Sequence, residues 1–306
     1  MIAMRRILIL FLDGVGLGLD DTATNPFVAA NTPNLSRLMS GHKLVSEQMS
    51  FSDNKNSFVS TDACMGVDGM PQSATGQATI MTGVNVPAYI GKHWGPKPSA
   101  EIRDLLRRDN ILQWMHSKNY SVRLANAYPP SFLNQLESGY RSPSAIQYAF
   151  ETVGSRMCSV EDLYDGNALS ADFTGEQWRS HLGFENTPIL SLNEAGKRLS
   201  LLSQQSKLLL FDCWHTDVVG HRGTMKAAVN MIERLDAVIG GILSSWREVD
   251  GLIVIVSDHG NLEDKTTRRH TCNRVPVLLF GDGHSRVAAN INDLSDIAPA
   301  LIAYLE

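Results

Sequence analysis

Short apolar runs alternate with longer amphipathic stretches along this chain of 306 residues. The first run, Ile7–Leu12, is apolar at every position. Such a continuous run is typical of a central parallel strand that is covered on both faces. Further apolar runs predict strands at 58–65, 120–125, 208–211, 252–256 and 275–280.

Apolar residues at helical spacing lie between these strands. In the clearest case, the stretch 225–246, one stripe is formed by Val229, Ile232, Leu235, Ile239 and Leu243. Other helices are predicted at 31–39, 73–83, 100–115 and 294–305. Because strands alternate with helices, we expect an α/β fold with a mostly parallel sheet sandwiched between helices.

Two segments depart from this pattern. The stretch 84–98 is rich in Gly and Pro and predicts a structured loop. The stretch 128–206 is irregular, with Pro129-Pro130, scattered glycines and short helical patches. We interpret it as a small inserted lid that separates a first part of the core, 1–127, from a second part, 207–306.

Composition narrows the class of protein. Hydrophobic residues make up 43% and charged residues 19%, and the net charge of −5 comes without a basic block, so nucleic-acid binding is not expected. No apolar run reaches membrane-spanning length, so we expect no membrane association. The four cysteines stand far apart and predict free thiols in a cytoplasmic protein. Nothing in the composition predicts the oligomeric state.

Ser73 is the candidate nucleophile. It follows the turn-forming Gly69-Met70-Pro71 and opens the helix predicted to end at Gly83. A hydroxyl in the first turn lies near unpaired backbone N–H groups and the positive end of the helix dipole. This place suits attack on an anionic substrate such as a phosphate ester. The alternative at this point is that Ser73 only caps the helix.

Acids and imidazoles gather where predicted strands end or begin. Open α/β sheets bind ligands at such an edge. These residues offer oxygen and nitrogen without thiolate, a set that suits Mn²⁺, Zn²⁺ or Mg²⁺ and disfavours a structural zinc site. The set comprises Asp13, Asp217, His221, Asp258, His259 and His270. The glycines after Asp13 resemble a dinucleotide-binding loop, but the acid precedes them and no clear ribose-binding acid follows.

Several motifs together resemble the alkaline phosphatase superfamily of metalloenzymes. They are LDGVG, NPF…NTPNL, GMPQSATG, DVVGH, SDHGN and HTCNRVP, and their order is most similar to the cofactor-independent phosphoglycerate mutase and phosphopentomutase branch. The resemblance implies two divalent metal ions, most often Mn²⁺ or Zn²⁺. It assigns one ion to Asp13, Ser73, Asp258 and His259 and the other to Asp217, His221 and His270, with Ser73 as the nucleophile.

The chain departs from the mutases at Gln77, where they have a histidine, and in the short segment 128–206, where they have a large cap. A small lid favours release of the phosphoryl group to water. We therefore expect a phosphohydrolase that acts on a small phosphorylated substrate through a phosphoserine. A phosphomutase is the alternative, followed by a non-catalytic metal-binding protein. A sulfatase is excluded, because Ser73 is followed by Ala74-Thr75-Gly76 and not by the sulfatase signature.

Three cations are candidates for binding the phosphate oxygens. Arg222 follows His221, Arg269 precedes His270, and Lys92 lies in the loop after the Ser73 helix. A solvated surface charge is the alternative for each of them.

Overall fold

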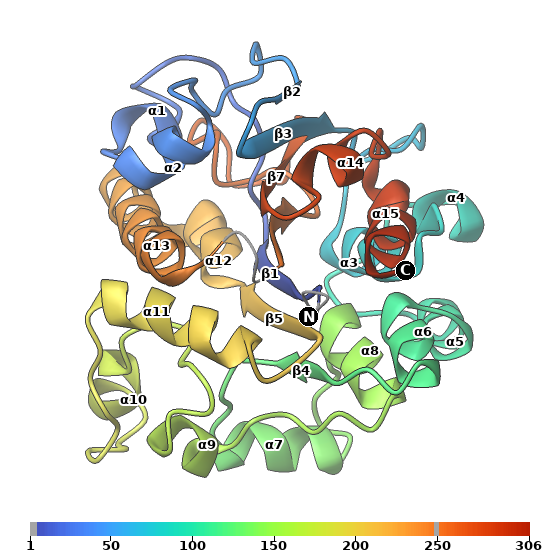
Figure 1. Cartoon of the computed structure of the whole chain (residues 1–306), viewed down its shortest axis with the longest axis vertical. Coiled ribbons are helices and arrows are strands. Elements are labelled where there is room, and N and C mark those ends of the chain that lie inside the picture. Colours follow the sequence, from blue (N-terminus) through green and yellow to red (C-terminus); the bar gives the residue numbers. More distant parts are fainter. Residues whose placement is uncertain (1–4, 248–250) are drawn as a thin grey trace.

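A seven-stranded sheet forms the middle of the molecule in the computed structural model, which describes residues 5–247 and 251–306 (Figure 1). The strand order is β2-β3-β7-β6-β1-β5-β4. The strands are β1 (Ile7–Leu12), β2 (Phe51–Ser52), β3 (Asn56–Thr61), β4 (Val122–Leu124), β5 (Leu208–Cys213), β6 (Leu252–Ser257) and β7 (Val275–Gly281). All six strands expected from the apolar runs are present, whereas the two-residue β2 is too short to leave a sequence pattern.

The sheet contains both parallel and antiparallel pairs. Strand β1 pairs in parallel with β5 on one side and β6 on the other, and β4 extends this parallel part. Strand β7 runs antiparallel to β6 and to β3, and β2 is antiparallel to β3. Five of the seven strands therefore point in one direction, which agrees with the expected mostly parallel sheet.

Helices cover both faces of the sheet, because the side chains of β1 alternate between two apolar layers. Ile7, Ile9 and Phe11 belong to one layer, and Leu8 and Leu10 belong to the other. The first layer is covered by α3 (Ser73–Thr82), α4 (Val86–Ile90), α5 (Ala100–Arg108), α6 (Ile111–Ser117), α8 (Ala145–Thr152), α14 (His284–Ala288) and α15 (Ile297–Leu305). The second is covered by α1 (Pro26–Ala29), α2 (Pro33–Leu38), α11 (Leu192–Ser203) and α13 (Met225–Ser245).

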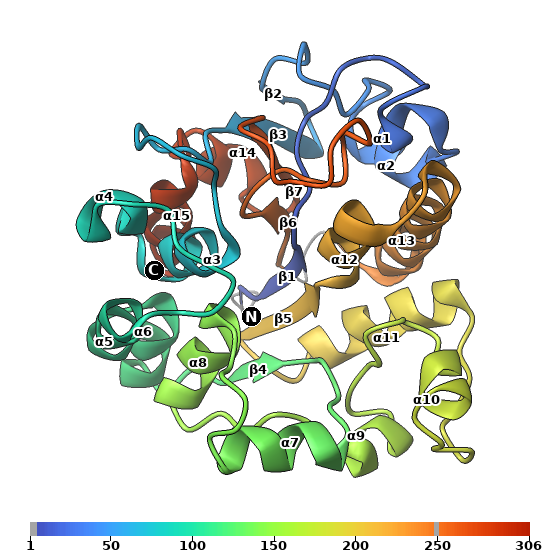
Figure 2. The ribbon, with the colours of Figure 1, turned by 180° about the vertical axis from the view of Figure 1, so that it is seen from behind.

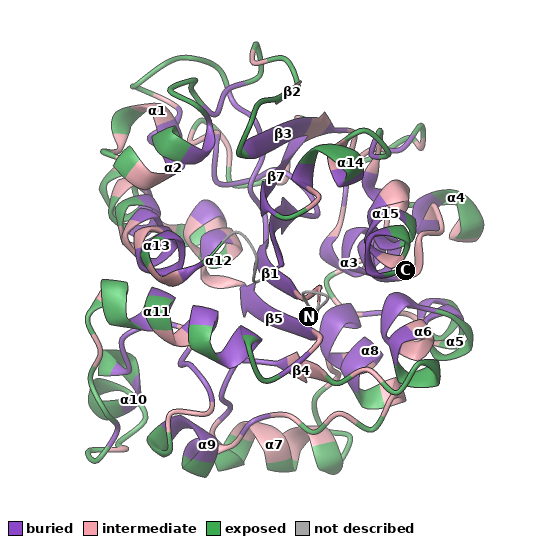
Figure 3. Cartoon of the chain, in the orientation of Figure 1, coloured by how far each residue is buried: buried purple, intermediate pink, exposed green. Residues whose placement is uncertain are grey.

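Burial follows these layers, as Figure 3 shows by the purple strands and the purple inner faces of the helices. Strands β1, β5, β6 and β7 are buried along their whole length. Of the predicted stripe on α13, four residues are buried and Val229 is half-buried. The predicted α/β sandwich is therefore the observed fold.

One predicted helix is two helices, which corrects the expected single helix at 100–115. The chain leaves the helical conformation at Asp109, and Asn110 begins a new helix. The Asn110 side chain accepts from Leu112 N at 2.8 Å and donates to Leu106 O at 2.6 Å. One side chain thus caps the end of α5 and the start of α6, and the apolar stripe continues across the break. The predicted loop 84–98 likewise contains the short helix α4.

The segment 128–206 contains α11 and four shorter helices. They are α7 (Pro130–Glu137), α8, α9 (Val160–Tyr164) and α10 (Glu176–Ser180). Helices α8 and α11 contribute to the two main apolar layers, whereas α7 and α9 lie near β4 and α10 lies beside α11 (Figure 2). A small separate cluster around Leu163 and Trp178 supports this edge. The division of the chain into two core parts and a lid remains a prediction.

The topology of the sheet brings the ends of several strands to the same edge. Strands β1, β5 and β6 are parallel neighbours, so their carboxyl ends meet at the same edge. Strand β7 is antiparallel to β6, so it begins at the edge where β6 ends. Residues that follow β1, β5 and β6 therefore meet residues that precede β7. Within the described ranges, no helix is long and apolar enough to cross a membrane.

Candidate metal centre and nucleophile

Ser73 is the first residue of α3 and not its cap. The N-cap is Gln72, in an extended conformation, and α3 ends at Gly83 in the left-handed conformation that favours glycine. The Ser73 hydroxyl is therefore free for another role. It lies 3.0 Å from Nε2 of His259, and the residue is only 6% exposed.

A first cluster of metal-capable groups lies beside this hydroxyl. His259 Nε2 is 3.2 Å from Asp13 Oδ1 and 3.7 Å from Asp258 Oδ2. All three residues are buried. Their ligand atoms lie within 4.8 Å of one another, close enough to surround one cation.

A second cluster adjoins the first. Helix α12 (His215–Arg222) carries Asp217 and His221 one turn apart, and His221 Nε2 lies 3.3 Å from Asp217 Oδ2. His270 Nε2 lies 3.6 Å from Asp217 Oδ1. The rings of His270 and His259 stack at 3.8 Å between centroids, so the two clusters form one continuous group. All seven ligand candidates predicted from the sequence lie together.

The orientation of the histidines fits a bound cation. The Nδ1 atoms of His221, His270 and His259 face the backbone oxygens of Arg268, Pro71 and Gly260, respectively. A carbonyl oxygen only accepts, so each Nδ1 carries a proton, and in the neutral form of each ring the lone pair lies on Nε2. The Nε2 atoms of His221 and His270 lie 3.1 Å apart, so two acceptors face one another. A cation between them would satisfy both.

The buried carboxylates also have oxygens that a cation would satisfy. Asp13 Oδ1 and Asp258 Oδ2 are buried without a hydrogen-bond partner within the described part of the chain. Burial, followed by the charge of Asp13, raises the pKa of Asp258 well above its usual value. Burial opposes protonation of His259, but Asp258 and Asp13 outweigh it and raise the pKa of this imidazole to about 10. These residues together fit a divalent metal ion with oxygen and nitrogen ligands.

Two further residues hold the ligand loops, and the sequence analysis did not single them out. Glu263 is buried and accepts from Gly16 N at 2.9 Å, Asn261 N at 2.7 Å and Asn273 Nδ2 at 3.0 Å. It thereby joins the loops that follow β1 and β6 to the loop that precedes β7. Asn261 donates to Asp217 Oδ1 at 2.6 Å. The available sequence signal was an acid, Glu263, two residues after the SDHGN motif.

A cavity of about 350 Å³ opens beside Ser73. Its lining from the sheet edge and from α3 includes Asp13, Asp212 and Gln77. Five of the other lining residues come from the segment predicted to be a lid, namely Tyr128, Phe132, Arg141, Ser144 and Gln147. This segment therefore contributes more of the pocket wall than its irregular sequence indicated.

The cations that line this cavity differ from those proposed from the sequence. Lys97 and Arg141 belong to the lining, whereas Lys92, Arg222 and Arg269 do not. Lys92 is exposed, and its ammonium lies 4.7 Å from the centroid of the Trp94 ring. Arg222 and Arg269 are exposed as well. A phosphate-binding role for these three residues remains a prediction.

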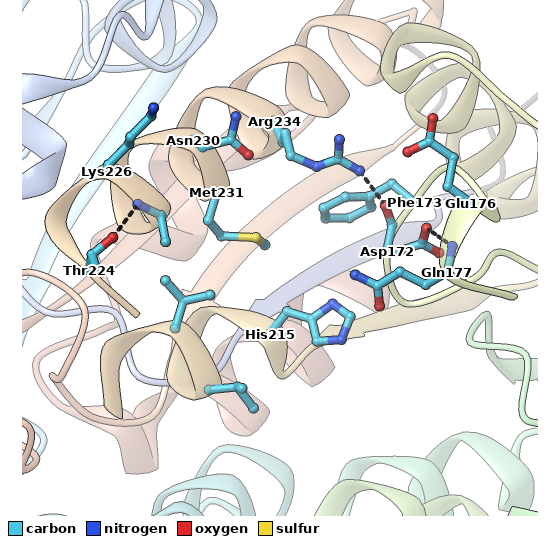
Figure 4. A pocket seen from close by; sticks show the side chains of 13 residues that line it. Asp172, Phe173, Glu176, Gln177, His215, Thr224, Lys226, Asn230, Met231 and Arg234 are labelled. Carbon is cyan, nitrogen blue, oxygen red and sulfur yellow. Dashed lines mark hydrogen bonds between the residues drawn. The ribbon is translucent and has the colours of Figure 1, made fainter. Parts of the chain in front are cut away.

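A second cavity, of about 790 Å³, lies against another face of α12 (Figure 4). It is lined by His215 of α12, by residues of α13 such as Met231 and Arg234, and by the segment 172–177. Arg234 donates to Asp172 O at 2.9 Å across one end of it. None of the seven ligand candidates is among the described residues that line this cavity. It is therefore separate from the pocket beside Ser73.

Comparison with known proteins places this chain in a family of metal-dependent enzymes. The model of the metalloenzyme superfamily matches residues 5–306. The chain is 33% identical over 132 residues to the 2,3-bisphosphoglycerate-independent phosphoglycerate mutase of Rhodopseudomonas palustris, covering 40% of this chain and 26% of that protein. It is 31% identical over 206 residues to the mutase of the same description from Ruthia magnifica subsp. Calyptogena magnifica, covering 62% and 40%. Less than half the length of each of these two mutases is therefore matched.

A solved structure shares the fold. The alkaline phosphatase from the Antarctic bacterium TAB5 superposes with a TM-score of 0.53 at 14% identity, covering 99% of this chain and 98% of that one. At this identity the likeness concerns the fold alone. The family resemblance predicted from the motifs is confirmed.

Proposed function

Because the chain belongs to the metalloenzyme superfamily, we propose that it transfers a phosphoryl group from a small phosphate ester to Ser73 and then back to the same molecule, as a phosphomutase does. The observation that carries this proposal is the Ser73 hydroxyl, which lies 3.0 Å from His259 in a pocket at the edge of the ligand cluster. Support for the mutase over the hydrolase comes from the curated relatives, which are named mutases.

The proposed ligands are those predicted from the sequence. Asp13, Ser73, Asp258 and His259 would hold one divalent ion, and Asp217, His221 and His270 would hold another. Mn²⁺ and Zn²⁺ suit this mixture of carboxylate and imidazole, and Mg²⁺ is a third option. When bound, such ions neutralise the charge of the phosphate and favour the ionised form of a serine hydroxyl.

The residues of the chain position the attacking Ser73 hydroxyl against the phosphate ester. Ser73 Oγ attacks phosphorus in line, its bond to phosphorus forms, and the bond to the leaving oxygen breaks. The leaving alcohol takes up a proton. Return of the phosphoryl group to a second hydroxyl of the same molecule then regenerates Ser73. Positioning and charge neutralisation are the main needs of this reaction, and buried, preorganised groups meet them.

The structure also weakens the physical reason for expecting hydrolysis. That expectation rested on a lid too small to enclose the site. Five residues between Tyr128 and Gln147 nevertheless line the pocket, and Gln77 of the Ser73 helix accepts a long hydrogen bond of 3.5 Å from Ile146 N. The lid segment therefore contacts both the pocket and the helix of the nucleophile. A walled pocket favours retention of the intermediate over its release to water.

The test is to measure isomer formation and phosphate release separately. The metal-loaded protein is incubated with 3-phosphoglycerate, with ribose 1-phosphate and with an aryl phosphate. We expect isomerisation to outrun phosphate release on one of the first two substrates, and Ser73→Ala to lower turnover at least ~10³-fold. Faster phosphate release on every substrate would restore the hydrolase. No turnover of any ester would favour the non-catalytic alternative.

A further inference from the structure

The pocket beside Ser73 contains charged groups that the seven ligand candidates do not include. They are Lys97, Arg141 and Asp212, and they come from three separate segments of the chain. Each lies on the pocket wall with Ser73 and Asp13. Their meeting in one cavity of about 350 Å³ is a result of the tertiary fold and not of a sequence motif.

Neither cation forms an ion pair within the described ranges, although the charges of Asp212 and Asp13 act on Lys97. Arg141 uses Nε to donate to Gln135 Oε1 at 3.3 Å, and its guanidinium lies 4.9 Å from the centroid of the Phe132 ring. Among the residues that the structure describes, no hydrogen bond engages the two terminal nitrogens of Arg141 or Nζ of Lys97. Burial, followed by the charge of Arg141, lowers the pKa of Lys97 against the opposing charges of Asp212 and Asp13. Two like charges that face one cavity indicate an anionic ligand group.

Asp212 provides a second, independent indication of a ligand. It is 3% exposed, it lines the pocket, and its Oδ1 is buried without a hydrogen-bond partner in the described part of the chain. Asn126 holds its backbone on both sides, donating to Asp212 O and accepting from Asp212 N, each at 2.8 Å. The backbone of Asp212 is thus held in place, and the buried oxygen of its side chain needs a partner. A ligand hydroxyl can pair with either form of the carboxyl group.

We propose that Lys97, Arg141 and Asp212 form the subsite for the leaving group. The substrate class is then a small phosphate monoester that carries a hydroxyl and a second anionic group. The hydroxyl pairs with Asp212, and the second anion pairs with Lys97 and, at the mouth of the pocket, with the exposed Arg141. This inference rests on the proposed function for the place of the reacting phosphate, which lies against Ser73 and the ligand cluster.

Binding to a protein that cannot turn over tests this subsite. Calorimetric titrations use metal-loaded Ser73→Ala with three probes. 3-Phosphoglycerate has a hydroxyl and a second anion, glycerol 3-phosphate has hydroxyls alone, and phenyl phosphate has neither. We expect 3-phosphoglycerate to bind at least ~10-fold more tightly than glycerol 3-phosphate. Adding Lys97→Met or Arg141→Met should reduce this preference to within about twofold and leave phenyl phosphate unchanged.

Asp212→Asn should weaken both hydroxyl-bearing probes and spare phenyl phosphate. Lys118→Met and Arg107→Met are matched controls, because both residues are exposed and neither lines this pocket. An unchanged preference in both cation variants would overturn the subsite. Equal weakening of all three probes would also overturn it, by assigning the cations to the reacting phosphate. These measurements do not depend on phosphoryl transfer, so failure of the proposed function would leave them interpretable.

Discussion

At the scale of single residues, His259 links the nucleophile to the metal ligands. Its Nε2 faces the Ser73 hydroxyl and the carboxylates of Asp13 and Asp258. In the metal-free protein those two carboxylates raise the pKa of His259 to about 10, against the effect of burial. Near neutral pH a proton therefore occupies the atom that would hold a cation.

Metal uptake should consequently release protons. At pH 8 the imidazole of His259 must lose its proton before Nε2 can bind a cation, so we expect at least one proton per chain to be released. Because one proton competes with the metal, affinity should rise about tenfold for each pH unit between 7 and 9 and level off above 10. Titration calorimetry in buffers with different ionisation enthalpies measures the release. Heats that do not depend on the buffer would contradict this assignment.

A second residue, Glu263, acts on the site without touching it. Its carboxylate accepts hydrogen bonds from several donors, including the backbone N–H groups of Gly16 and Asn261. In Glu263→Gln an amide NH₂ replaces one oxygen and faces those donors. We expect the free energy of unfolding to fall by about 1–3 kcal/mol and metal affinity to weaken with it.

Chemical denaturation and metal titration check this prediction. The control is Glu185→Gln, at an exposed position, which should stay within about 0.5 kcal/mol of the parent protein. Wild-type stability and metal affinity in Glu263→Gln would show that the loops are held by other contacts.

At the scale of elements, glycines let the ligand-bearing helices approach the loop after β6. A Cβ atom at Gly76 of α3 would lie 2.8 Å from both Cβ and the backbone oxygen of Asp258. A Cβ atom at Gly220 of α12 would lie 2.6 Å from Cγ of Asn261. Both glycines belong to the motifs that identified the family, so each motif preserves a helix contact as well as its ligands.

Gly76→Ala should therefore push α3 away from Asp258. We expect a loss of about 1–3 kcal/mol in unfolding free energy and a longer distance between Ser73 and His259. Gly139→Ala is the control: it meets open space at a φ of +73° and should cost about 1 kcal/mol through backbone strain alone. Metal affinity and the free energy of unfolding, measured on both variants, test whether a side chain at position 76 crowds Asp258. Equal effects in both would show that crowding at Asp258 is unimportant.

The pattern of apolar residues predicted most helices and strands. It did not predict the break in a helix that one side chain caps, or the direction in which a strand runs. The apolar stripe across 100–115 continues from α5 to α6, so it could not reveal the break, although Asp109-Asn110 before an apolar pair is a usable cap signal. The direction of β7 leaves no mark on its apolar run. It is this antiparallel direction that brings His270 to the edge shared by Asp13 and Asp258.

At the scale of the whole molecule, the ligand cluster could be predicted and the substrate pocket could not. Each predicted ligand lies near a strand end, on α12 or at the start of α3, and belongs to a recognisable motif. Lys97 and Arg141 belong to segments without periodicity, and only the tertiary fold brings them into one pocket with Ser73. The share of the pocket wall that the predicted lid contributes was hidden for the same reason, because it depends on tertiary contacts.

The fate of the phosphoryl group also belongs to this scale, because the segment 128–206 walls the pocket. Cutting its contact with α3 by Gln77→Ala should raise the share of phosphate released to water relative to isomer, because the wall loosens beside Ser73. Product analysis by phosphorus NMR measures this share. Gln113→Ala serves as the control, because Gln113 lies on α6 and does not line the pocket. An unchanged share in Gln77→Ala would show that this contact does not control water access.

The most direct test of the central claim is the mass of the peptide that contains Ser73. Metal-loaded protein is mixed with a phosphate ester, quenched in acid within the first turnover, digested and measured by mass spectrometry. We predict one phosphoryl group on Ser73, dependent on added divalent metal and lost in Ser73→Ala and after chelation. Turnover of the ester without any phosphorylated Ser73, or phosphorylation at another residue, would contradict the assignment of Ser73 as the phosphoryl acceptor.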